Sequence, residues 1–201
     1  MRTRQGAWVW GLACAVVLAT GGCTGGKSNE GLPSVTQAPS DPGEVSVPSA
    51  TPVPTAATPT PPPEMAQPGA DGAAAVSQYF IELYMYAVAT GDLDEWRAMS
   101  ADDCKMCNKV IAEVEQLVAE QHTVTTDSLE FPSVSGTEIA PGTSFSASLR
   151  VDQGPWTELD SSGGVVDTGP AVSADMYFAL LWQGDSWLVR QVDVHEATPQ
   201  G

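Results

Sequence analysis

One helix decides the fold: residues 73–89 read AAAVSQYFIELYMYAVA. Its large apolar side chains recur at spacings of three and four, which is the period of a buried helix face. Thr90 and Gly91 follow, and a glycine in this place is typical of the left-handed residue that ends a helix. We therefore predict a long helix whose wide apolar stripe packs against a core.

Two shorter helices are expected after it. Asp92 and Ser100 each stand three residues before an acidic residue, which is the spacing of a capping box. The first box precedes Trp96, the apolar anchor of a short second helix. The second box precedes apolar residues at helical spacing up to about Gln121. These patterns predict a second helix from Asp92 and a third from Ser100.

The residues that follow have the period of strands. Four segments alternate or are rich in β-branched and aromatic residues, namely 123–131, 144–151, 176–182 and 187–194. A further strand near Trp156 is left open. Three helices followed by about four antiparallel strands predict an α+β domain, with the helices packed on one face of a curved sheet.

The last two of these segments predict a hairpin. Residues 184–185 are Gly-Asp, a pair suited to a two-residue type II′ turn. Such a turn sets Trp182 opposite Trp187, and further along it sets Leu180 opposite Val189.

The segment before the first helix has a different composition. Residues 24–70 contain 11 of the 16 prolines of the chain and no aromatic residue. Such a segment cannot bury enough apolar surface to offset its conformational entropy. We therefore predict a lipidated cysteine and disordered tether over 23–70 that buries nothing, and a globular domain over 71–201.

The N-terminus resembles the signal of bacterial lipoproteins. Residues 1–22 contain two early arginines, then an apolar stretch too short to span a membrane. Small residues lead into Cys23 as in a lipobox, although Thr20 stands where leucine is usual. The resemblance implies a diacylated Cys23 and a location on the outer face of the bacterial cell membrane. The alternative is cleavage by an ordinary signal peptidase.

The charge balance excludes some classes of partner. The chain has 8 Lys+Arg against 25 Asp+Glu, a formal net charge of −17. Binding to nucleic-acid phosphates requires clustered basic residues, and so does a polybasic contact with anionic lipid. We therefore expect no nucleic-acid partner, and contact with the membrane only through the lipid anchor.

Cys104 and Cys107 form the most suggestive chemical motif. Outside the reducing cytosol such a pair is expected as a disulfide that holds one helical turn. Thiol–disulfide exchange is the alternative, because a Cys-x-x-Cys at a helix N-terminus lowers a thiol pKa. The acidic neighbours Asp102 and Asp103 disfavour a thiolate. Zinc would require two further ligands, so no metal site and no cofactor are predicted.

A possible pocket is expected from four residues: Tyr79, Tyr84, Trp96 and His122. The aromatic three also fit an ordinary core. His122 could be a general base, or a side chain that compensates the dipole at the end of the third helix. Acidic residues at 92–95 are interpreted as capping and first-turn acids of the second helix, because the glycine and the final glutamate of a calcium loop are absent.

The combined pattern resembles a known family. Its elements are Tyr79-Phe80, Thr90-Gly91-Asp92, the run from Trp96 to Ser100, and Cys104-x-x-Cys107. These are similar to uncharacterised actinobacterial lipoproteins whose domain resembles the cone-like fold of nuclear transport factor 2. The resemblance implies a fold and a location but no activity.

Two hypotheses for function follow. The first is a membrane-anchored, extracytoplasmic, non-enzymatic module that binds a protein or a small apolar ligand. The alternative is an enzyme of the isomerase, dehydratase or hydrolase type that uses the cone pocket, or a thiol–disulfide oxidoreductase acting through Cys104 and Cys107.

Overall fold

A computed structural model of the chain describes residues 56–197. The predicted signal peptide over 1–22, the lipidation of Cys23 and the tether up to residue 55 lie outside the described residues. Within 56–197, none of the helices combines the length and apolar character that a membrane span requires.

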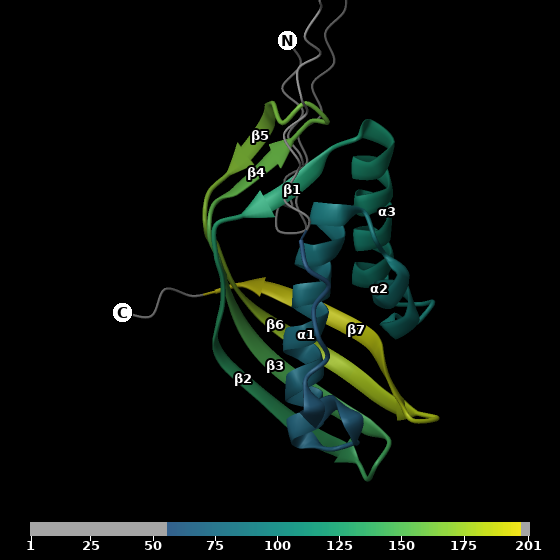
Figure 1. The fold of residues 1–201 in the computed structure, drawn as a ribbon. Coiled ribbons are helices and arrows are strands. Elements are labelled where there is room, and N and C mark those ends of the chain that lie inside the picture. The colour runs from purple at the N-terminus through teal and green to yellow at the C-terminus, as the bar shows by residue number, and fades with distance from the viewer. Residues whose placement is uncertain (1–55, 198–201) are drawn as a thin grey trace, which may run out of the picture. The chain divides into compact units, whose positions relative to one another are not determined.

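Three α-helices follow a short 3₁₀-helix, η1 (Figure 1). Their bounds are η1 Pro63–Ala66, α1 Ala70–Thr90, α2 Asp94–Met99 and α3 Lys105–Glu120. As predicted, α1 ends at Gly91, which has a φ of 79° and donates its N–H to the carbonyl of Ala87. Twelve residues of α1 are buried, so it is the central helix of the core.

The third helix starts later than expected. Ser100 does not begin α3, because its hydroxyl donates to the Trp96 carbonyl at 2.6 Å and so closes α2 instead. The next residue, Ala101, donates its N–H to the carbonyl of Val189 at 3.0 Å. The link between the helices is thereby held against the sheet, and Cys104 becomes the N-cap of α3. The second helix also begins later than predicted, because the N-cap of α2 is Leu93 and not Asp92. The Asp92 carboxylate still accepts from the N–H of Asp94 at 3.0 Å.

Seven antiparallel strands form two sheets. They are β1 Thr123–Thr126, β2 Leu129–Ala140, β3 Ser144–Gln153, β4 Trp156–Leu159, β5 Val165–Gly169, β6 Val172–Gln183 and β7 Ser186–Glu196. The four-stranded sheet has the order β2-β3-β6-β7, and the three-stranded sheet has the order β1-β4-β5. The α+β class is confirmed, whereas the expectation of about four strands was too low.

The two sheets join where the paired strands β2 and β3 bend into the paired strands β1 and β4 (Figure 1). The N–H of Gly154 donates to the carbonyl of Ser128 at 2.9 Å, and the N–H of Asp127 donates to the carbonyl of Pro155 at 3.2 Å. A Cβ on Gly154 would lie 2.7 Å from the Ser128 hydroxyl oxygen. The bend therefore depends on a glycine that lets the two backbones approach closely.

The C-terminal hairpin has the predicted register but another turn. Trp182 pairs with Trp187, and Leu180 pairs with Val189. Gly184 and Asp185 both have positive φ angles, 54° and 71°. Two positive φ angles define a type I′ turn rather than the predicted type II′.

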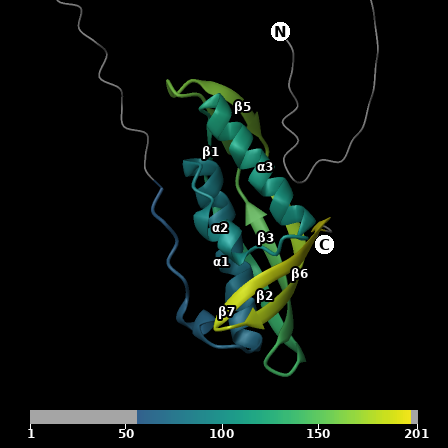
Figure 2. The same ribbon diagram turned by 90° about the vertical axis from the view of Figure 1, so that its right-hand side faces the viewer.

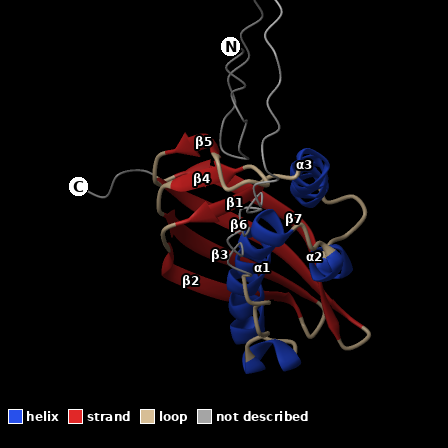
Figure 3. Ribbon diagram, turned by 45° about the horizontal axis from the view of Figure 1, so that its top comes forward, coloured by secondary structure: helices blue, strands red, loops and turns tan. Residues whose placement is uncertain are grey.

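The helices cover one face of the four-stranded sheet (Figures 2 and 3). Along β3 every second residue is buried, which is the alternation of a strand with one face on the core. The buried side chains of β6 and β7 continue that face; they include Met176, Phe178, Leu180 and Val189.

The folded part of the chain begins before residue 71. The indole N–H of Trp187 donates to the carbonyl of Met65 at 2.9 Å, and the Met65 side chain packs against the core. A Cβ on Gly72 would lie 2.8 Å from the Trp187 ring and 2.6 Å from the Gln67 carbonyl oxygen. The end of the predicted tether is therefore packed between α1 and β7.

A chain that begins at Asp71 is accordingly expected to be less stable than one that begins at Ala56. Losing the partly buried Met65 side chain and the hydrogen bond to Trp187 should lower the free energy of unfolding by about 2 kcal/mol. Thermal unfolding should show a decrease of about 8 °C. Equal melting temperatures would mean that residues 56–70 bury nothing, as the composition alone predicts.

Candidate functional site

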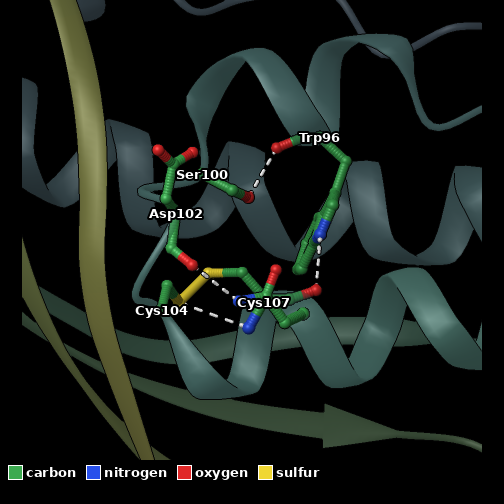
Figure 4. The surroundings of a disulfide bond; sticks show 6 residues. Trp96, Ser100, Asp102, Cys104 and Cys107 are labelled. Carbon is green, nitrogen blue, oxygen red and sulfur yellow. Dashed lines mark hydrogen bonds between the residues drawn. A yellow bond between two sulfur atoms is a disulfide. The ribbon is translucent and has the colours of Figure 1, made fainter.

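The structure joins Cys104 to Cys107 by a disulfide (Figure 4). The two Cα atoms are 5.3 Å apart, and the residues are 1% and 0% exposed. The Cys107 N–H donates to the sulfur of Cys104 at 3.2 Å, and the carbonyl of Cys107 accepts from the indole N–H of Trp96 at 3.2 Å. The bond therefore holds the first turn of α3 in place beside a buried tryptophan.

This environment disfavours thiol–disulfide exchange. Catalytic cysteines need a partly exposed sulfur and a stabilised thiolate. Here both cysteines are buried, and the disulfide leaves neither thiol free to ligate a metal.

Replacing both cysteines by serine is expected to lower the free energy of unfolding by about 1–2 kcal/mol, because the closed loop is very short. Chemical denaturation of the oxidised wild type and the double variant would measure this. The reduced protein should react slowly with iodoacetamide at neutral pH. A rapid reaction together with a reduction potential of about −120 to −200 mV would instead indicate a redox catalyst.

The aromatic residues expected near a pocket form part of the core. Tyr79, Tyr84 and Trp96 are 0%, 4% and 1% exposed. The Phe80 ring stacks on that of Trp96 with a centroid separation of 3.8 Å. The Tyr79 hydroxyl is buried without a hydrogen-bond partner at bonding distance. Burial and the Glu95 carboxylate raise the pKa of Tyr79.

A groove lies on the outer side of these residues, between α1 and α2. Its volume is about 350 Å³, and its lining comprises Thr58, Leu83, Tyr86, Asp92, Asp94, Glu95, Trp96 and Ala98. The Tyr86 hydroxyl donates to the Asp92 carboxylate at 3.0 Å, and the Thr58 hydroxyl donates to the Tyr86 oxygen at 3.3 Å. The groove thus combines an apolar wall with three carboxylates.

The acidic residues beside the groove do not cap α2 as predicted. The N-cap is Leu93, and no side chain caps it. Asp92, Asp94 and Glu95 are all exposed, and the Asp92 carboxylate accepts from the N–H of Asp94. Within residues 56–197 the structure contains no ion pair between these three carboxylates and a lysine or arginine. The predicted capping box of Asp92 and Glu95 is therefore wrong, and the sequence did not predict a groove beside these residues.

His122 lies apart from the buried aromatic residues, in a cluster of carboxylates. Its Nδ1 atom is 2.7 Å from an oxygen of Glu158 in β4 and 3.6 Å from an oxygen of Glu120 at the end of α3. The three side chains are 19%, 14% and 28% exposed. The predicted four-residue pocket is therefore divided between the core and this cluster.

Glu113 adds a titratable group near this cluster. Burial raises its pKa to about 7, against a smaller lowering by the hydroxyl of Tyr84 and by Lys109, while Glu158 raises it further. The Tyr84 hydroxyl donates to one Glu113 oxygen at 3.4 Å, and the other oxygen is buried without a hydrogen-bond partner. A carboxyl group that titrates near neutral pH is suited to proton transfer.

The comparisons with solved structures concern the fold alone. The chain is similar to the intermembrane-space region of the chloroplast protein ARC6, at 14% identity and a TM-score of 0.43, covering 62% of this chain and 97% of that one. It is similar to an uncharacterised protein with a cystatin-like fold from Caulobacter vibrioides, at 15% identity and a TM-score of 0.41, covering 61% and 88%. It is also similar to an NTF2-like protein of unknown function from Pseudomonas putida KT2440, at 17% identity and a TM-score of 0.35, covering 61% of this chain and 84% of that one.

At these scores the solved structures carry no argument about ligand or activity. No curated protein matches the chain. The model of one family of unknown function, DUF6318, matches residues 49–193. That match covers the end of the predicted tether and every helix and strand but the last residues of β7. The chain therefore belongs to the DUF6318 family of unknown function.

Proposed function

We propose that this protein is a lipid-anchored binding protein on the outer face of the bacterial cell membrane, and that its domain binds a ligand in the groove between α1 and α2. The observation that carries the proposal is the composition of that groove. The partly exposed Tyr86 ring supplies aromatic surface, Leu83 and Trp96 form the buried floor beneath it, and three exposed carboxylates lie beside it. The volume of about 350 Å³ is in the range of small-molecule sites.

The groove favours an organic cation with an apolar body. Exposed carboxylates attract a cation, and the Tyr86 ring beside them offers a face for the cation and a contact for its apolar body. A neutral apolar ligand would gain no electrostatic attraction from the three carboxylates. This proposal differs from the protein or small apolar ligand that the sequence suggested, because the sequence did not show that three carboxylates and Tyr86 line one groove.

The enzymatic alternative has one supporting observation. Glu113 has a pKa near that of a general acid–base group. However, the groove lining does not include Glu113 or His122, so these groups do not face the space in which a ligand would lie. The arrangement favours binding over catalysis.

Titration with phenethylammonium, followed by NMR of the protein, tests the groove. The wild type should show saturable shifts for residues around Trp96, and the uncharged analogue 2-phenylethanol should bind more weakly. The double variant Asp94→Asn/Glu95→Gln should bind phenethylammonium about tenfold more weakly. Glu130→Gln, an exposed carboxylate on β2, is the matched control. Equal affinity for both compounds in all variants would contradict the proposal.

The anchor is tested separately in cells. Labelled palmitate should be incorporated into the wild type, and the variant Cys23→Ser should lose the label and be released from membranes. Two or three acyl chains bind a membrane stably where one chain does not. Incorporation that survives the substitution would rule out Cys23 as the lipidated residue.

A further inference from the structure

We propose that Glu120, His122 and Glu158 form a binding site for a divalent transition-metal ion of the Zn²⁺ class. One nitrogen and two carboxylate oxygens of these residues all lie within 4.8 Å of one another. No metal site was expected from the sequence, where Cys104 and Cys107 were considered as zinc ligands and the acidic residues 92–95 as calcium ligands.

The backbone holds the three residues in place before any ion binds. Gln121 ends α3 in the left-handed conformation with a φ of 58°. The N–H of His122 donates to the carbonyl of Leu117 at 2.8 Å, which completes the helix cap. This cap fixes His122 five residues after Leu117, the last buried residue of α3. It also places Glu120 beside His122.

The third ligand comes from the sheet. Glu158 pairs with Val124 in the ladder between β1 and β4, and Val124 is buried. His122 directly precedes β1, so the ladder brings the Glu158 side chain next to the imidazole. The three ligands therefore come from three secondary-structure positions whose backbones are hydrogen-bonded, which lowers the entropic cost of assembling the site.

The distances fit a small coordination sphere. Zinc bonds to histidine nitrogen and carboxylate oxygen are about 2.0–2.2 Å, so two ligand atoms in a tetrahedral site are about 3.4 Å apart. The distances from His122 Nδ1 to the carboxylate oxygens of Glu158 and Glu120 are 2.7 Å and 3.6 Å. Small side-chain rotations convert the ion pair into the coordinated arrangement.

Local charge also favours a cation. Two carboxylates, those of Glu120 and Glu158, face the one imidazole of His122. A bound divalent ion would compensate this excess of negative charge, and the partial exposure of all three ligands leaves a path for its entry.

The donor set selects the class of ion. A neutral imidazole with carboxylates is typical of sites for zinc, cobalt, nickel or manganese, whereas calcium and magnesium prefer oxygen ligands alone. Three protein ligands leave at least one coordination position for water. None of the three ligands belongs to the residues that line the groove between α1 and α2. The inference is therefore independent of the proposed function.

Calorimetric titration of the purified full-length protein with Zn²⁺, after removal of metals with EDTA, tests the site. The wild type should bind one ion with a dissociation constant of about 10 μM or lower, and Ca²⁺ at the same concentration should not compete. His122→Ala and Glu158→Gln should each weaken binding at least about tenfold. His195→Ala, which changes the other histidine of the chain, should leave the affinity unchanged.

Two further measurements keep the test decisive. Glu120→Gln changes the most exposed ligand, so its effect on Zn²⁺ affinity can be measured even if the other variants fold poorly. Co²⁺ substitution should give the visible absorption of a four-coordinate site in the wild type and lose it in His122→Ala. Zinc affinity that is equal in the wild type and in all three ligand variants, or absent from the wild type, would overturn the proposal.

Discussion

Replacing Trp96 by alanine is expected to lower the free energy of unfolding by about 4 kcal/mol, the largest effect predicted for this domain. The side chain is 1% exposed and stacks on Phe80 at 3.8 Å. Its ring also lies 6.2 Å from that of Tyr84. Alanine would leave a cavity among these rings, and the carbonyl of Cys107 would lose the indole N–H that donates to it.

Urea denaturation of the wild type, Trp96→Ala and Trp96→Phe would separate these contributions. Phenylalanine keeps most of the stacking but not the hydrogen bond, so its loss should be smaller than that of alanine. Tyr177→Ala is the control, because Tyr177 is 50% exposed on β6 and its loss should cost little. A loss below about 1 kcal/mol for Trp96→Ala would show that this corner is not part of the cooperative core.

Local periodicity explains the parts of the fold that the sequence predicted. The apolar stripe of α1 and its Gly91 cap are properties of consecutive residues. The register of the β6–β7 hairpin likewise follows from a two-residue turn and the alternation beside it. Such features require no knowledge of distant segments, which is why α1 and the hairpin were confirmed.

Features that depend on distant segments were missed. The predicted strand segment 123–131 contains β1 and only the first residues of β2. The rest of β2 contains Pro132 and Gly136, which favour a loop when they are considered alone. Here β2 is an edge strand, where a proline is tolerated. A Cβ on Gly136 would collide with the carbonyl oxygen of Ala70, so glycine is needed where α1 crosses the strand.

In the candidate sites, too, the sequence indicated single residues but not their partners from distant segments. His122 was identified from its residue type, but its partner Glu158 is 36 residues away in a strand that was not assigned. Asp94 and Glu95 were identified only as first-turn acids. Glu113 was detectable in principle, because it stands three residues after Val110 and four before Leu117, on the apolar face of α3. A glutamate at such a position is unusual unless it has a partner.

Glu113 is the basis of the second large effect, a dependence of stability on pH. Burial raises the pKa of Glu113 from 4.5 to about 7. Between these two values the folded protein retains a proton that the unfolded chain has released. Stability is therefore expected to fall as the pH rises from about 4.5 to about 7, by about 3 kcal/mol at about 1.4 kcal/mol per pKa unit.

Glu113→Gln removes the titrating group while keeping a side chain that can accept from the Tyr84 hydroxyl. The variant should lose this part of the pH dependence and should be more stable than the wild type at pH 8. Urea denaturation between pH 5 and pH 8, in EDTA so that no metal ion binds Glu158, would measure it. Glu130→Gln, with an exposed carboxylate, should keep the dependence of the wild type.

The pH dependence of the Glu113→Gln variant also bears on the choice between a binding protein and an enzyme. If the slope disappears in Glu113→Gln, the carboxyl group is protonated in the folded protein at neutral pH and costs stability whenever it ionises. A carboxyl group kept at such a cost is suited to a functional role, and its position outside the groove lining separates that role from ligand binding in the groove. Equal slopes in the wild type and Glu113→Gln would show that Glu113 is ionised at neutral pH like an exposed carboxylate, and the enzymatic alternative would lose its one supporting observation.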